Sequence, residues 1–265
     1  PPRSTLFPYT TLFRSPGALF GLKWAGFDVV SLANNHMNDY GPAAIRETLD
    51  YLDLLGIART GAGIDETSAR APAVLEARGA RVGFLAYAEG IWSVLPAASE
   101  RPGVALADPA RLAADIASLR KTARPDYIVV SVHWGEEHER HPRQAQRDFG
   151  RAAIDAGADL VLGHHPHVLQ SLERYREGFI VYSLGNFVFD MAADPTYDTA
   201  ALRITLAEGR ILTAEVLPLR IERRDYAPRP AAPEEAGRIL SGLRDTSRLL
   251  GTTVEIGEGR GRVIF

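Results

Sequence analysis

Residues 127–138 read YIVVSVHWGEEH, and residues 159–167 read DLVLGHHPH. Each stretch begins as a short apolar run, rich in β-branched residues, which predicts a buried β-strand. Each run then passes directly into a polar segment that carries histidines. The same order recurs at residues 27–40, FDVVSLANNHMNDY. At residues 179–190, FIVYSLGNFVFD, an apolar run is followed by Asn186 and Asp190 instead of histidine. Four predicted strands therefore end in polar clusters.

Helices are predicted between these strands. Pro42 suits the first position of a helix and Gly56 suits its end. Asp108 and Pro109 begin a second helix, and residues 142–156 are predicted to form a third. Strands that alternate with helices favour an α/β sheet with helices on its faces.

The C-terminal part has a different pattern. Residues 201–206 and 211–219 are predicted strands joined by a turn at residues 208–210, which indicates a hairpin and an antiparallel part of the sheet. A proline-rich connector follows over residues 228–233. Residues 234–250 are then predicted to form a last amphipathic helix.

The composition is that of a globular protein, with 46% hydrophobic and 24% charged residues in a chain of 265. A formal net charge of −3 argues against a surface that coats nucleic acid, and we expect no nucleic-acid partner. The absence of cysteine excludes disulfides, thiolate metal sites and cysteine nucleophiles. The glycine motifs of nucleotide-binding loops and the serine-hydrolase elbow are also missing, so those chemistries are not indicated.

The first residues differ from the rest. The triplet TLF at residues 5–7 recurs at residues 11–13. The segment has neither a helical period nor the apolar core of a signal peptide. We therefore treat residues 1–16 as a foreign or disordered leader and residues 17–265 as a single domain.

The polar clusters predict a shared site. Sites in α/β proteins form at the carboxyl ends of the strands, so the four clusters converge if the strands are parallel neighbours. Pro166 favours an extended backbone at His165, and residues two apart then project to the same side, as His165 and His167 would. On this reasoning His164 points elsewhere, while the other two imidazoles face one or two metal ions.

Each cluster also has a simpler interpretation. His133 could be a hydrogen-bonded residue at the edge of the core, and Asn35 could belong to an Asn-rich turn. Asp39 could orient the ring of His36 or cap the helix that follows. Nitrogen and oxygen ligands without sulfur suit Mn²⁺, Fe²⁺, Zn²⁺ or Mg²⁺, and the sequence does not choose among them.

Four motifs occur in order: AGFDVVSLANNHMNDYG at 25–41, SVHWGEEH at 131–138, GADLVLGHHPHVLQ at 157–170 and YSLGNFVFD at 182–190. Together they resemble the CapA family of poly-γ-glutamate capsule proteins, which is similar in fold to the calcineurin-like metallophosphoesterases. The resemblance implies an α/β fold in which a two-sheet β-sandwich is flanked by helices, with a metal centre at one edge.

The resemblance also implies roles for particular residues. His36 matches the catalytic histidine of the phosphoesterases. Two divalent ions would be held by Asn35, His133, His165 and His167, together with ligands from the segment discussed next. Around them we expect side chains that orient ligands or contact substrate: Asp39, Glu137, His164 and Asn186.

One departure from the family bears on activity. Family members begin with a strand that ends in Gly-Asp and then carry an Asn-Leu-Glu motif, and residues 1–16 stand where these belong. We therefore expect the first strand to be missing, with an open sheet edge or groove in its place. We also expect an incomplete metal site that could be inactive.

The predicted function is that of a CapA-like protein of poly-γ-glutamate capsule synthesis with a metal-dependent, phosphoesterase-type hydrolase site. Two alternatives remain open: a non-catalytic component that binds or exports the polymer, and a metal-dependent amide hydrolase. Expected partners are an anionic polymer or phosphoester substrate and a membrane-bound capsule synthase. The family implies a place outside the bacterial cytoplasmic membrane, with an N-terminal anchor. Arg220, Arg223 and Arg224 either contact the polymer or form a solvated face.

Overall fold

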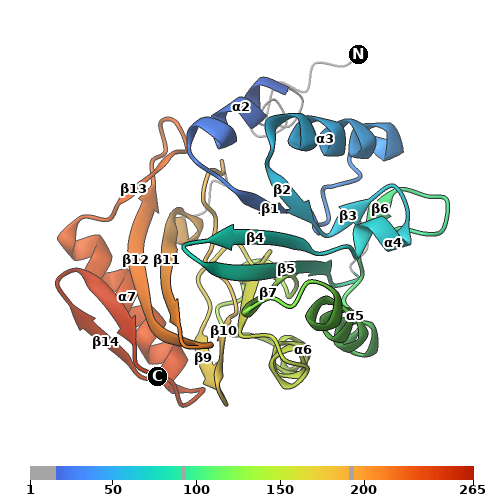
Figure 1. Ribbon diagram of the computed structural model, residues 1–265. Coiled ribbons are helices and arrows are strands. Elements are labelled where there is room, and N and C mark those ends of the chain that lie inside the picture. Colours follow the sequence, from blue (N-terminus) through green and yellow to red (C-terminus); the bar gives the residue numbers. More distant parts are fainter. Residues whose placement is uncertain (1–15, 91–92, 191–193) are drawn as a thin grey trace.

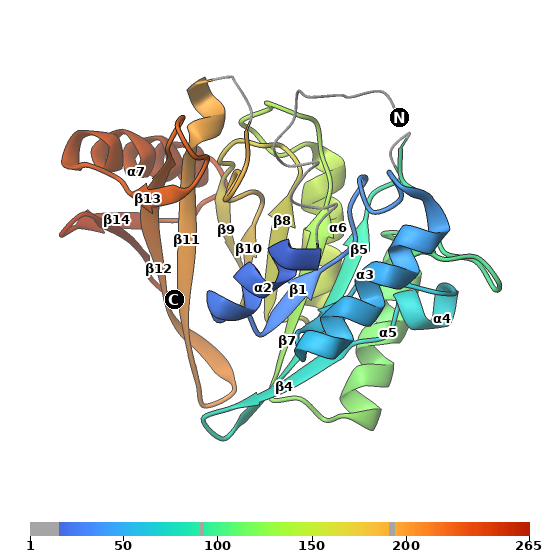
Figure 2. The same cartoon turned by 90° about the horizontal axis from the view of Figure 1, so that it is seen from above.

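The computed structural model describes residues 16–90, 93–190 and 194–265 (Figure 1). The leader predicted over residues 1–16 lies outside these ranges, apart from Pro16. Among the described residues, a six-stranded and a five-stranded β-sheet are the two larger sheets, and helices flank them (Figures 1 and 2). The predicted two-sheet arrangement with flanking helices is confirmed.

The six-stranded sheet contains three of the four predicted strands. Its order is β4-β5-β7-β8-β10-β9, with β5, β7, β8 and β10 parallel and the two edge strands antiparallel. Its strands are β4 (Ala73–Ala77), β5 (Ala80–Ala88), β7 (Tyr127–His133), β8 (Leu160–His164), β9 (Leu172–Tyr175) and β10 (Gly178–Val181). The parallel centre gives these strands a common carboxyl edge.

The central strands are apolar at nearly every position because both faces of the sheet are covered. On β7, Val130 and Val132 belong to the core cluster shared with the helices α5 (Pro109–Thr122) and α6 (Gln144–Asp155). Val129, the residue before Val130, belongs to the cluster shared with the second sheet. Alternate side chains of one strand thus enter two different cores.

The helix signals in the sequence are confirmed. Asp108 accepts hydrogen bonds from the backbone N–H groups of Ala110 and Arg111, at 2.9 and 3.0 Å, and so caps α5. Gly56, with φ of 63°, ends α3 (Gly41–Leu55) in the left-handed conformation that glycine adopts without strain. None of the helices in the described ranges is long and apolar enough to cross a membrane.

The five-stranded sheet is antiparallel, as the predicted hairpin indicated. Its two longest strands form that hairpin, and the turn between them lies at Glu208 and Gly209, which have φ of 53° and 72°. Part of the predicted proline-rich connector is a short edge strand, a position that tolerates proline. The elements here are η1 (Asp194–Tyr197), β11 (Asp198–Ala207), β12 (Arg210–Ile221), β13 (Pro228–Pro230), α7 (Pro233–Arg248), β14 (Val254–Gly257) and β15 (Arg260–Val263).

The strand predicted near residue 30 is not part of the six-stranded sheet, because β1 pairs in parallel with β2 instead. Ile45 and Leu49 of α3 share a core cluster with Ala86 and Ala88 of β5, which attaches this layer to the central sheet. The remaining elements of the layer are α2 (Pro16–Trp24), β1 (Val29–Ser31), β2 (Ala58–Thr60), β3 (Ala62–Gly63), α4 (Glu66–Ala69) and β6 (Gly103–Val104).

Gly163 of β8 is a position where the packing leaves no space for a side chain. A Cβ there would lie 2.2 Å from the carbonyl oxygen of Tyr182 and 2.3 Å from Nε1 of Trp134. We expect Gly163→Ala to lower the free energy of unfolding by about 1–3 kcal/mol, as overpacking does, in a urea titration. Gly237→Ala in α7 is the control, since a Cβ there would meet no described atom within 4 Å beyond its chain neighbours and the backbone of its own helix. A Gly163→Ala variant as stable as the parent would contradict this packing.

Candidate metal centre

The predicted site residues gather at the carboxyl ends of β7 and β8. His133 ends β7, His164 ends β8, and the two are direct partners in the parallel register. The loop after β1 reaches the same edge, so that Asn35 contacts His133 across a separation of 98 residues in the chain. The clusters therefore meet even though β1 belongs to a different sheet.

A chain of hydrogen bonds runs through the imidazoles. Nε2 of His133 lies 2.8 Å from Oδ1 of Asn35, and Nδ1 of His133 lies 2.9 Å from Nδ1 of His164. Nε2 of His164 lies 2.9 Å from Oγ of Ser131. Because an amide oxygen only accepts, His133 donates from Nε2 and accepts at Nδ1 from His164. His164 in turn accepts from the Ser131 hydroxyl.

His164 thus holds the His133 ring by a hydrogen bond at Nδ1, while Asn35 contacts the other ring nitrogen, Nε2. A histidine that binds a metal is commonly oriented by a partner at its other ring nitrogen. If His133 offered Nε2 to a cation, its proton would move to Nδ1, and the hydrogen bonds to His164 and Ser131 would reverse direction. Ser131 was missed in the sequence, although it lies two residues before His133 in a strand and so shares its face.

Burial keeps these imidazoles neutral. Desolvation lowers the pKa of His133 far below its ordinary value, and the neighbouring His164 adds to the effect. Desolvation also lowers the pKa of His164 to about 4, with a further contribution from His165. The pKa values of His165 and His167 are likewise lowered, mainly by desolvation. A neutral imidazole retains the lone pair that a cation needs.

His165 and His167 lie beside this chain of hydrogen bonds. The ring centroids of His165 and His133 are 4.5 Å apart, and those of His165 and His167 are 5.9 Å apart. Nδ1 of His167 lies 2.7 Å from Oδ1 of Asn186, so His167 donates there and its lone pair is on Nε2. Nδ1 of His165 is buried and has no hydrogen-bond partner in the described part of the chain.

The backbone of this motif bends, so the prediction of an extended backbone at His165 is wrong. His165 has φ of 103° and His167 has φ of 59°. The bend lets the carbonyl oxygen of Pro166 accept a hydrogen bond from the backbone N–H of His138, at 2.8 Å. Such backbone positions cost about 1–3 kcal/mol each and cluster at functional sites.

Glu137 approaches the same two histidines. One ligand atom from each of Glu137, His165 and His167 can be chosen so that all three lie within 4.8 Å of one another. The adjacent Glu136 instead pairs with Arg143, with 2.6 Å between Oε1 and Nη1. The two neighbouring carboxylates therefore differ in their surroundings.

His36 and Asp39 lie on the exposed rim. Nδ1 of His36 is 2.9 Å from Oδ2 of Asp39, whereas the N-cap residue of α3 is Tyr40. Of the two roles considered for Asp39, the structure shows the contact with the ring. Oδ1 of Asn34 accepts from the backbone N–H of His36 at 2.8 Å. The turn interpretation thus applies to Asn34, while Asn35 is buried.

The residues present fit a divalent metal ion. The donors are neutral imidazole nitrogens, an amide oxygen and a carboxylate, which suit borderline and harder divalent metals. The unpartnered Nδ1 of His165 and the orientation of His167 by Asn186 are the features expected of ligands held ready for a cation.

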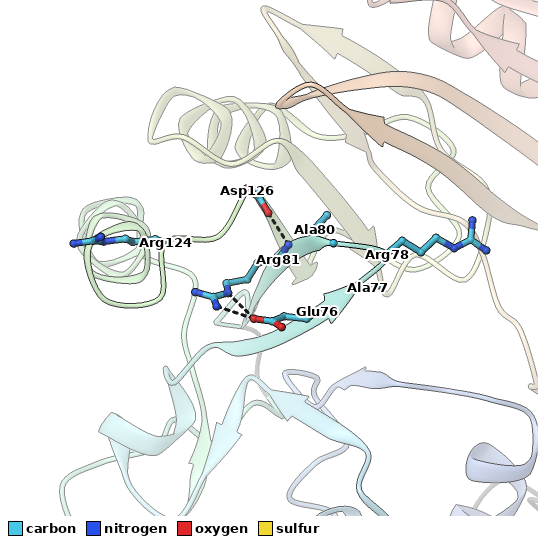
Figure 3. A pocket seen from close by; sticks show the side chains of 8 residues that line it. Glu76, Ala77, Arg78, Ala80, Arg81, Arg124 and Asp126 are labelled. Carbon is cyan, nitrogen blue, oxygen red and sulfur yellow. Dashed lines mark hydrogen bonds and ion pairs between the residues drawn. The ribbon is translucent and has the colours of Figure 1, made fainter.

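A separate hollow of about 360 Å³ lies at the opposite ends of the strands (Figure 3). Arg81 pairs there with Glu76 at 2.7 Å, and its backbone N–H donates to Asp126 at 2.7 Å. Because β7 has seven residues, this hollow is roughly 20 Å from His133. It is lined by Glu76, Ala77, Arg78, Gly79, Ala80, Arg81, Arg124 and Asp126 and forms no part of the candidate centre.

The sequence matches the family described as bacterial capsule synthesis protein PGA_cap over residues 5–191. This chain belongs to that family. It is 35% identical over 229 residues to the capsule biosynthesis protein CapA of Bacillus anthracis, covering 86% of this chain and 56% of the relative. It is 36% identical over 208 residues to the PGA biosynthesis protein CapA of Bacillus subtilis, and the match covers 78% of this chain and 54% of that relative. The chain thus spans about half the length of these relatives, and the predicted family is confirmed.

Two solved structures share the fold of this PGA_cap chain. The sulfate thiohydrolase SoxB of Thermus thermophilus aligns with a TM-score of 0.53 and 15% identity, covering 92% of this chain and 40% of SoxB. The NAD nucleotidase NadN of Haemophilus influenzae aligns with a TM-score of 0.50 and 12% identity, and the alignment covers 89% of this chain and 50% of NadN. The fold is of the calcineurin-like metallophosphoesterase type, as the sequence predicted.

The metal-free protein should lose stability in acid. His164 has a pKa of about 4 in the folded chain and about 6.5 when unfolded, so between these values only the unfolded chain binds the proton. The free energy of unfolding therefore falls as the pH drops from 6.5 toward 4, and His164 accounts for about 2 kcal/mol between pH 7 and pH 5. Urea titrations in chelator measure this. In His164→Asn the free energy of unfolding should fall less steeply between pH 7 and pH 5 than in the parent. If it falls equally steeply in both, His164 is not a buried neutral imidazole.

Proposed function

We propose that this chain acts in poly-γ-glutamate capsule synthesis and carries a metal-dependent hydrolase centre of the phosphoesterase type. The main support is the 2.8 Å contact between Asn35 and His133, next to His165 and His167. These side chains come from the ends of three different strands. Such a gathering of neutral donors is what a metal centre requires.

Asn35, His133, His165 and His167 would hold divalent metal, two ions in the full-length protein, of the Mn, Fe, Zn or Mg type. A divalent ion supplies a Lewis acid that polarises a phosphoester and lowers the pKa of water. The chain's own contribution is to orient the ligands. Asn186 fixes the ring of His167 through Nδ1.

His36 would act as the proton donor or as a stabiliser of negative charge in the transition state. Asp39 contacts Nδ1 of its ring, so exchange of a proton with substrate would take place at Nε2. Its exposed position on the rim suits a group that meets substrate arriving from solvent. Asp39 is then a positioning residue for His36.

The names of the Bacillus relatives refer to the capsule and to poly-γ-glutamate, which supports a polymer-related role. We infer an anionic polymer or a phosphoester as the substrate. A membrane-bound capsule synthase is the proposed partner, and the outer side of the bacterial cytoplasmic membrane is the proposed location.

Two arginines of the basic stretch at the end of β12 and in the turn after it, Arg220 and Arg223, are paired with carboxylates. Arg220 pairs with Asp194 at 2.7 Å and with Asp198 at 2.5 Å, and Arg223 pairs with Asp194 at 3.1 Å. These carboxylates neutralise the arginines locally. The pairing favours the solvated face that the sequence offered as the alternative.

The test replaces His36. With Mn²⁺ present, His36→Ala should lower kcat for a model phosphodiester by about 100-fold or more, the usual contribution of an acid–base group, and leave metal binding unchanged. His141→Ala is a matched control, since His141 is exposed and lies outside the centre.

Unchanged kcat in His36→Ala would rule out the proposed role. Cleavage of γ-glutamyl oligomers without cleavage of the phosphodiester would favour the amide hydrolase. Polymer binding that resists chelator, with no hydrolysis of either substrate, would favour the non-catalytic component.

A further inference from the structure

We propose that Glu137 is a metal ligand, and that it forms a cation site with His165 and His167 within this chain. This inference rests on the proposed metal centre and names the residue that brings negative charge to it. The three side chains offer ligand atoms that lie within 4.8 Å of one another. None of the four metal ligands suggested by the family resemblance is anionic.

The loop that carries Glu137 is fixed immediately after it. The backbone N–H of His138 donates to the carbonyl oxygen of Pro166 at 2.8 Å, between the two histidines of the cluster. Nε2 of Gln170 donates to the carbonyl oxygen of Glu139 at 2.7 Å. The loop after β7 is therefore tied to the chain after β8, which sets Glu137 beside His165 and His167.

Buried amides hold this tie in place. Gln146 and Gln170 are almost fully buried, and Nε2 of Gln146 donates to Oε1 of Gln170 at 3.0 Å. Gly135, with φ of 88°, lies so close to Gln146 that a Cβ would come within 2.8 Å of its side chain. Buried polar groups of this kind specify one arrangement when they are all hydrogen-bonded.

Glu136 and Glu137 differ in a way that points to a ligand. Glu136 pairs with Arg143, which also contacts Glu89 at 3.1 Å. In the described part of the chain, the carboxylate of Glu137 has no hydrogen bond or salt bridge, and its side chain is exposed. An exposed carboxylate can stay solvated without a partner, so the observation that matters is its place beside His165, whose buried Nδ1 also lacks one.

The distances allow a single ion after side-chain rotation. Zinc binds nitrogen and oxygen ligands at about 2.0–2.2 Å in a tetrahedral arrangement, so two ligand atoms of one ion are about 3.5 Å apart. The spacing of up to 4.8 Å exceeds this by about 1.3 Å. Rotation of the exposed Glu137 side chain can bring its carboxylate closer to the two histidines, while His167 stays oriented by Asn186.

The donor set also narrows the choice of metal. Two imidazoles and one carboxylate favour first-row transition ions such as Mn²⁺, Fe²⁺ and Zn²⁺ over Mg²⁺ or Ca²⁺, which prefer oxygen ligands throughout. The carboxylate offsets part of the charge of the cation. A neutral imidazole cannot provide this, so removing the charge of Glu137 weakens the site.

Isothermal titration with MnCl₂ and ZnCl₂ on the chelator-stripped chain tests the proposal. Glu137→Gln should raise the Kd at least tenfold, and Glu137→Asp should recover part of the affinity. Glu136→Gln is the matched control and should bind as the parent does, because its carboxylate pairs with Arg143 instead. Thermal unfolding in chelator should be the same for Glu137→Gln and the parent, since the side chain is exposed.

The outcomes separate this inference from the proposed function. Glu137→Gln binding with parental affinity, while His167→Ala loses binding, would overturn the role of Glu137 and leave the metal centre standing. An equal loss in Glu136→Gln would show that only the general charge of the loop matters and would also overturn it. A parent chain that binds neither ion would overturn both proposals.

Discussion

The contact between Asn35 and His133 is the constraint on which the rest of the site depends. In the described part of the chain β1 pairs with β2, and no strand ladder joins it to the central sheet. The backbone N–H of Leu32 donates to the carbonyl oxygen of Thr60 at 2.9 Å, which ties the loop after β1 to β2. Its contacts with the central sheet include a core cluster that contains Leu32 and Ala88, and the 2.8 Å hydrogen bond between Asn35 and His133. His36, the next residue, takes its place on the rim from this anchor. The catalytic candidate is thus positioned by the same contact that gathers the metal ligands.

Burial and hydrogen bonding act together on the histidines. Desolvation holds their pKa values below the ordinary range, so the rings are neutral. Each ring is then oriented by what its other nitrogen meets, His164 in the case of His133 and Asn186 in the case of His167. The left-handed backbone at His165 is unfavourable by itself, and the hydrogen bond from His138 to Pro166 helps to hold it. A site of this kind is stabilised by its surroundings and needs little rearrangement to accept an ion.

Much of the fold follows from local patterns. Residues 127–132 are apolar at every position except Ser131 because both faces of β7 are covered, and the hairpin at Glu208 and Gly209 follows from its turn residues. The separate sheet of β1 could not be predicted, because strand pairing depends on distant partners. The bend at His165 was missed for the same reason: its partner, the loop after β7, is far away in the sequence. The position of the polar clusters at the ends of predicted strands indicated which residues would meet, and it did not predict how their rings would be oriented.

The imidazoles of His165 and His167, just after the carboxyl end of β8, are proposed to share one cation. X-ray absorption at the zinc edge of the Zn²⁺-loaded chain tests it most directly. We expect nitrogen and oxygen ligands at about 2.0–2.1 Å from the zinc, with the multiple-scattering pattern of at least two imidazoles, and we expect this pattern to be lost when His165 and His167 are both replaced by alanine. A shell of oxygen alone, or an imidazole pattern that survives this double replacement, would contradict it.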